Sequence, residues 1–157
     1  MEHIARFLTS SSGQNAWDEH NAPPVLGLKV SAGLGKTRTA LECIAKHGHE
    51  FLKRGHILFY VPTLDLAVEA EKTFRELNSD HPSFVLRGRS AINPGTATAM
   101  CARSDVAKEI AKNVSSVTRA LCREETRGGK IVEAACAKGC PYLAQEAITK
   151  PHVVFLA

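Results

Sequence analysis

The sequence predicts an α/β fold built on a parallel sheet, and three observations predict it. A glycine-rich turn ending Gly35-Lys36-Thr37 stands between an apolar run and a helical pattern. Apolar runs and amphipathic helical patterns then alternate as far as residue 86, and an apolar strand pattern returns at residues 152–157. Strands that alternate with helices are typical of a parallel sheet with right-handed crossovers.

The first predicted strand covers residues 25–30 and leads into a phosphate-binding turn. Its glycines let backbone N–H groups converge on an anion, and the following helix N-terminus adds positive charge. In such a turn the lysine reaches the β and γ phosphates and the threonine hydroxyl holds Mg²⁺. We therefore predict ATP and Mg²⁺ as ligands, with Lys36 and Thr37 as catalytic residues. The predicted nucleotide-binding residues are Ser31, Ala32, Gly33, Leu34, Gly35, Lys36, Thr37 and Arg38.

Two features of this turn leave alternatives open. Val30 stands where the pattern G-x-x-x-x-G-K-[ST] prefers a small residue. A chance glycine turn with a solvated lysine is the competing interpretation. Gln14, upstream of the turn, is either an adenine-reading residue or a solvated loop residue.

The next elements follow from hydrophobic periodicity. A helix is expected over residues 37–47, followed by a strand over 56–61 whose near-continuous apolar character predicts burial on both faces. Residues 64–77 place apolar side chains at spacings of three and four, which predicts an amphipathic helix. A short third strand is expected over residues 84–86.

Pro62 and Thr63 follow the second predicted strand, at the sheet edge where open α/β folds bind ligands. A hydroxyl beside a helix N-terminus suits a phosphate of nucleic acid. The alternative is a strand terminator with Thr63 as a simple helix N-cap.

Composition restricts the class of protein only loosely. The chain has 157 residues and a net charge of +4, which permits a nucleic-acid partner without requiring one. No apolar run reaches the roughly 18 residues of a membrane helix, and no secretory signal is read at the N-terminus. We expect a cytoplasmic protein with no membrane partner and with reduced cysteines.

From residue 91 the pattern changes to loop and several short helices. Four cysteines here follow the spacing C-x20-C-x13-C-x3-C. Four thiolates suit Zn²⁺ or a [4Fe–4S] cluster, and four buried thiols without metal are the alternative. The last two cysteines are expected to share one helix face. The candidate metal ligands are Cys101, Cys122, Cys136 and Cys140. The neighbouring basic residues, which are interpreted as a solvated face, are Arg119, Arg123, Arg127 and Lys130.

These motifs together resemble a known family. The glycine-rich turn is similar to a P-loop, and Pro62-Thr63-Leu64-Asp65-Leu66-Ala67 resembles motif Ia of superfamily 1 and 2 helicases. The cysteine set ending Cys140-Pro141-Tyr142 resembles the iron–sulfur helicases of the XPD and DinG type, and also helicase-like ATPases of mobile elements.

The resemblance implies a RecA-like P-loop NTPase, the ATP-binding first motor domain of a DNA helicase, with a helical cysteine-bearing insertion. It implies single-stranded DNA as partner, with RNA as the alternative, and iron–sulfur before zinc at the cysteines. The implied nucleic-acid-binding residues are Pro62, Thr63, Arg87 and Arg89.

The resemblance also implies a domain organisation. We expect a lead-in over residues 1–24, a RecA-like core over 25–90, the insertion over 91–149 and a returning core strand over 150–157. No apolar strand ends in the Asp-Glu pair of a Walker B motif, and no second motor domain follows. The sheet is thus expected to be incomplete and to end on an unpaired edge strand, with a C-terminal motor segment of a parent protein as partner. The alternatives are a non-motor nucleotide- or metal-dependent nucleic-acid-binding module, or an inactive remnant.

Overall fold

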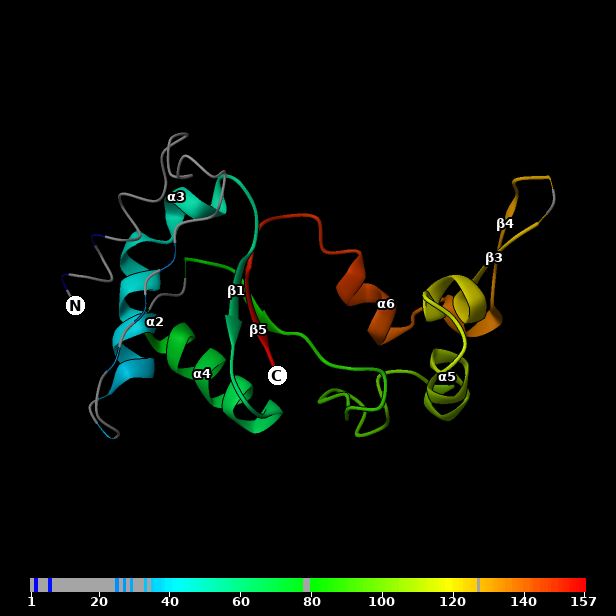
Figure 1. The fold of residues 1–157 in the computed structure, drawn as a ribbon, viewed down its shortest axis with the longest axis horizontal. Coiled ribbons are helices and arrows are strands. Elements are labelled where there is room, and N and C mark those ends of the chain that lie inside the picture. Colours follow the sequence, from blue (N-terminus) through cyan, green and yellow to red (C-terminus); the bar gives the residue numbers. More distant parts are fainter. Residues whose placement is uncertain are drawn as a thin grey trace. The chain divides into compact units, whose positions relative to one another are not determined.

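The computed structural model divides the chain into two compact units, shown in Figure 1. Unit 1 comprises Met1–Leu86 and Lys150–Ala157, and unit 2 comprises Arg87–Thr149. The structure describes residues 35–77, 80–126 and 128–157, and the single positions 2, 6, 25, 27, 29 and 33. The strand predicted over residues 25–30 and Gln14 fall mainly or wholly outside the described residues. No helix formed by the described residues combines the length and apolarity needed to cross a bilayer.

Unit 1 is built on a parallel three-stranded sheet. The strands β1 (Ile57–Tyr60), β2 (Ser83–Val85) and β5 (Val153–Leu156) lie in the order β1-β5-β2. Phe59 of β1 is in register with Phe155, and Phe84 of β2 with Val154. The last strand is therefore paired on both edges, which corrects the expectation that it would form an unpaired edge. The described strands confirm a small parallel sheet in a mixed α/β fold.

The described residues of unit 1 also form three helices, α2 (Lys36–His47), α3 (His49–Leu52) and α4 (Leu64–Leu77) (Figure 1). Helix α4 has the bounds that the sequence predicts, and it contacts α2, β2 and β5. The core between helices and sheet contains fully buried Leu41, Phe74, Val153 and Phe155. An amphipathic helix buries one stripe of apolar side chains, so this packing accounts for the spacing seen in the sequence.

Strand β1 differs from its prediction. Ile57 and Phe59 pack against the core, but Leu58 and Tyr60 are 52% and 72% exposed. The apolar run predicted burial on both faces. Within the described residues, α2 and α4 cover only one face of the sheet, because both pack into the same core cluster.

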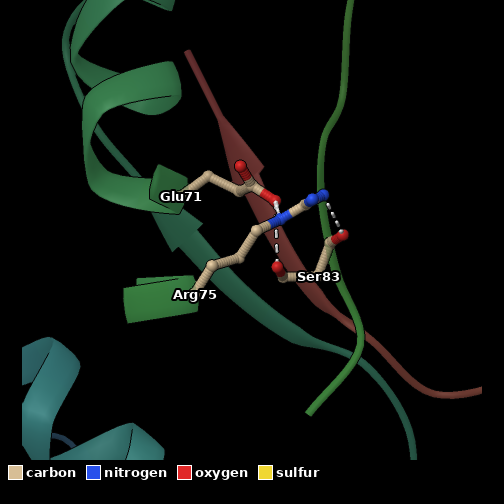
Figure 2. A network of polar contacts seen from close by, with 3 residues as sticks. All are labelled: Glu71, Arg75 and Ser83. Atoms are coloured by element: carbon tan, nitrogen blue, oxygen red, sulfur yellow. Dashed lines mark hydrogen bonds and ion pairs between the residues drawn. The ribbon is translucent and has the colours of Figure 1, made fainter. Parts of the chain in front are cut away.

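A polar network ties α4 to the start of β2 (Figure 2). The Ser83 hydroxyl donates to Glu71 Oε1 at 3.0 Å, and the Arg75 guanidinium pairs with the same carboxylate. Arg75 Nη2 also donates to the Ser83 carbonyl oxygen at 3.4 Å. The Glu71 side chain is only 12% exposed, so its charge is compensated where it is shielded from water.

Unit 2 contains short elements around a small core of its own. Helix α5 spans Ser104–Ala111, a π-helical turn η1 spans Thr118–Cys122, a 3-10 turn η2 spans Ala135–Ala137, and α6 spans Pro141–Glu146. Strands β3 (Arg123–Glu125) and β4 (Ile131–Glu133) pair as an antiparallel hairpin that the sequence did not predict. The buried residues of this core are Ala107, Leu121, Cys122 and Leu143.

Candidate functional site

The glycine-rich turn has two glycines in the left-handed region among its described positions. Gly33 has φ 79° and Gly35 has φ 67°, both in the left-handed region. A side chain there would be strained, since only glycine adopts this region without steric cost. The predicted ligand residues Ser31, Ala32 and Leu34 lie outside the described residues.

Helix α2 begins directly after this turn, with Gly35 as its N-cap. Gly35 has no side chain to cap the helix, and the first turn carries no acidic residue. Lys36, Thr37 and Arg38 occupy that turn instead. Cations at a helix N-terminus oppose the helix dipole, and a bound anion would offset that cost. Arg38 also pairs with Glu42 one turn later, at 3.0 Å on the exposed face.

The structure brings two predicted nucleotide-binding residues, Thr37 and Arg38, and part of the predicted motif Ia segment to one cavity of about 340 Å³ in unit 1. The start of α2, the end of β1 and the first turns of α4 form its wall. Helix α4 lies here because it follows β1, and elements that follow parallel strands begin at the carboxyl edge of the sheet. The lining residues are Thr37, Arg38, Leu41, Val61, Pro62, Leu66, Glu69, Ala70 and Thr73.

Thr63 caps helix α4. Its Oγ1 accepts a hydrogen bond from the Leu66 N–H at 3.3 Å, and its carbonyl oxygen accepts one from the Ala67 N–H at 3.0 Å. This is the N-cap role that the sequence offered as the alternative. A hydroxyl that accepts one hydrogen bond keeps its own hydrogen as a donor, so capping and a phosphate contact are compatible.

Arg87 and Arg89 belong to unit 2. The Arg87 backbone exchanges two hydrogen bonds with the Gln145 side-chain amide, at 2.8 and 3.0 Å. Arg89 uses its guanidinium within the unit: Nη2 donates to Thr118 Oγ1 at 2.7 Å, and the group stacks 3.9 Å from the ring centroid of Tyr142. These contacts give Arg89 a structural role, and a nucleic-acid contact by either arginine stays a prediction.

Two of the four candidate metal ligands meet at Arg89. Its Nη1 lies 3.5 Å from Cys122 Sγ and 3.9 Å from Cys101 Sγ. Burial is the largest single influence and lowers the pKa of the Arg89 guanidinium. The hydrogen bonds to Cys122 and Cys101, together with the charge interactions with Cys122 and Tyr142, raise that pKa above its usual value overall. Arg89 therefore stays charged beside the two sulfurs.

The other two cysteines are not placed as predicted. Cys136 lies in the 3-10 turn η2 and Cys140 is the N-cap of α6, with Gly139 at φ 70° between them. They do not share a helix face, because the extended Lys138 and the left-handed Gly139 separate the two elements. In the parts of the chain that the structure describes, no group of three or more His, Cys, Asp or Glu side chains is placed to hold a metal ion.

The sequence missed several residues that the structure brings to these places. Glu69 and Thr73 fall within the helix predicted over residues 64–77 and were given no site role, and the packing of α4 beside α2 places them at the cavity. Thr118 connects Arg89 to Glu146, whose Oε1 accepts from the Thr118 hydroxyl at 3.2 Å. Sequence spacing carries no signal for such contacts, since the partners lie far apart in the chain.

Comparison with known proteins identifies one family. A family model described as "Type III restriction enzyme, res subunit" matches residues 2–129. No curated protein and no solved structure matches the chain. The family is a helicase-like superfamily 2 ATPase domain, which confirms the superfamily 2 part of the resemblance, while the iron–sulfur part stays a prediction. The match covers well over half of the sequence, so this chain belongs to the family of the type III restriction enzyme res subunit.

Proposed function

We propose that this chain binds Mg·ATP and couples it to single-stranded DNA, as the first motor domain of a helicase or translocase. One observation carries the proposal: two left-handed glycines lead into a helix whose first turn is cationic and lacks an acidic residue. An anion of high charge suits that arrangement, and a triphosphate is the anion that the family implies.

The backbone and two side chains at the start of α2 bind the nucleotide and its metal ion. The backbone N–H groups at the start of α2 and the Lys36 ammonium bind the phosphates. The Thr37 hydroxyl is an oxygen ligand of the kind that Mg²⁺ prefers. When bound, Mg²⁺ would neutralise part of the charge on the β and γ phosphates.

Coupling to nucleic acid is proposed at the motif Ia segment. Pro62 lines the cavity that Thr37 also lines, and Thr63 presents a hydroxyl at the N-terminus of α4. A structural change at the bound phosphates would therefore be transmitted across this cavity to the N-terminus of α4. We propose that the bound nucleic acid is DNA. A competition experiment between DNA and RNA for the chain distinguishes these two partners.

Steady-state ATP hydrolysis with Mg²⁺ tests this function, with and without single-stranded DNA. We expect turnover that DNA stimulates and that Lys36→Ala abolishes, because the variant lacks the cation that reaches the phosphates. Lys46→Ala, at the other end of α2, is the matched control and should behave as wild type. Nucleotide binding through Lys36 without turnover would favour a non-motor module or an inactive remnant. A wild-type chain that binds no nucleotide would overturn the proposal.

We also propose a metal at Cys101, Cys122, Cys136 and Cys140, an iron–sulfur cluster before zinc. The thiol-only donor set and the gathering of Cys122 and Cys140 in one core cluster support it, whereas the side-chain placement does not fit a ligand set. Elemental analysis of anaerobically purified protein tests it. About four irons with a brown colour would support a cluster, one zinc would support a zinc site, and neither metal would overturn both.

A further inference from the structure

Among the described residues that line the cavity beside the glycine-rich turn, one carries a carboxylate, Glu69 on α4. Thr37 lies on the same cavity from the start of α2. Within the described part of the chain, neither the Glu69 carboxylate nor the Thr37 hydroxyl has a hydrogen-bond or ion-pair partner. Glu42 on α2 and Glu71 on α4 each pair with an arginine, and Glu76 of α4 does not line the cavity.

We propose that Glu69 is a positioning residue for Mg²⁺ at the nucleotide site, accepting hydrogen bonds from the water shell of the ion held by Thr37. The inference rests on the proposed function and adds a residue to it. Glu69 lies outside the glycine-rich turn and outside the motif Ia segment, on the second turn of α4.

The chemistry of the donors fits this role. Mg²⁺ prefers oxygen ligands and keeps several of its waters when a protein binds it. Those waters present only hydrogens outward, so an ionised carboxylate beyond them is a suitable acceptor, and such outer partners orient a metal site. A cavity of about 340 Å³ has room for a hydrated ion, since each water takes about 30 Å³ in the liquid.

The rest of the cavity wall leaves the charge of the Glu69 carboxylate available. Leu41, Val61 and Leu66 make much of the wall apolar. Arg38 lies on the same wall but forms its ion pair with Glu42 and not with Glu69.

A Mg²⁺ titration of nucleotide binding tests the inference on the full chain. A fluorescent ATP analogue is held at fixed concentration, and its binding is followed as Mg²⁺ is added. For Glu69→Gln we expect the half-maximal Mg²⁺ concentration to rise about tenfold, the lower end of the effect of outer metal partners. Binding in EDTA should equal that of wild type, because the phosphate contacts remain.

Glu76→Gln is the matched control, an exposed glutamate on the same helix that does not line the cavity. Its titration should superimpose on wild type. A Glu69→Gln titration that also superimposes on wild type, while Lys36→Ala abolishes binding, would overturn the role of Glu69 and leave the nucleotide site standing. Absence of nucleotide binding by wild type would instead overturn the proposed function, and this inference with it.

Discussion

At the scale of single residues, the Glu71–Arg75–Ser83 network shows how a shielded charge holds an element in place (Figure 2). The Arg75 side chain is 64% exposed, so water screens its ion pair with Glu71 and the pair contributes little to stability. The hydrogen bond from Ser83 to Glu71 is part-buried and is therefore the larger contribution. The network fixes the start of β2 against α4.

Removal of Glu71 is expected to loosen that attachment. Glu71→Ala should lower the free energy of unfolding by about 1–2 kcal/mol, because the Ser83 hydroxyl loses its acceptor in a part-buried place. Urea denaturation followed by circular dichroism measures the change. Glu76→Ala is the control, the same substitution on an exposed position of α4, and should change stability by less than about 0.5 kcal/mol. Equal effects of the two variants would contradict the role given to the network.

Single residues also limit what spacing can predict. The positive φ angles of Gly33 and Gly35 agree with the glycine requirement of the turn, which the sequence motif already contained. The engagement of Arg89 by Thr118, Cys122 and Tyr142 could not be predicted. Its partners lie some 30 to 50 positions away, and only the packing of unit 2 brings them together.

At the scale of elements, periodicity predicted helix α4 and the parallel strands well. Helical spacing of three and four is a strong signal over fourteen residues, and the structure places α4 at those bounds. Strand order had no such signal. Strand β5, the last in the chain, lies between β1 and β2 because parallel pairing on both edges satisfies its backbone groups.

The short elements of unit 2 were the least predictable. Strands β3 and β4 have three residues each, too few for a period-two pattern to show. The hairpin exposes Ile131 at 61%, so burial does not drive its pattern either. The π-helical turn Thr118–Cys122 positions Cys122 and Thr118 toward Arg89, and such turns are frequent at functional sites.

At the scale of the whole molecule, charge is divided unevenly between the two units. Unit 2 carries ten basic and six acidic residues, and unit 1 carries ten of each. The net charge of +4 therefore belongs entirely to unit 2. A basic unit is consistent with the nucleic-acid binding that the family suggests.

This division predicts a salt-sensitive interaction with nucleic acid. If the four net charges neutralise four phosphates of a single strand, a rise from 50 to 200 mM salt should weaken binding about 50-fold. Fluorescence anisotropy of a labelled oligonucleotide measures the affinity at each salt concentration. An affinity that stays constant over this range would show that phosphate contacts by unit 2 do not drive binding.

The sequence by itself determined the local chemistry: the glycine turn with Lys36 and Thr37, the amphipathic helix α4 and the strands of a parallel sheet. These depend on neighbours a few positions apart, which a sequence displays directly. The tertiary structure alone decided that β5 is the middle strand, that Glu69 joins Thr37 at one cavity, and that Arg89 contacts both Cys101 and Cys122. Those relations join residues distant in the chain, and they exist only because burial of the apolar faces selects one packing of helices and strands.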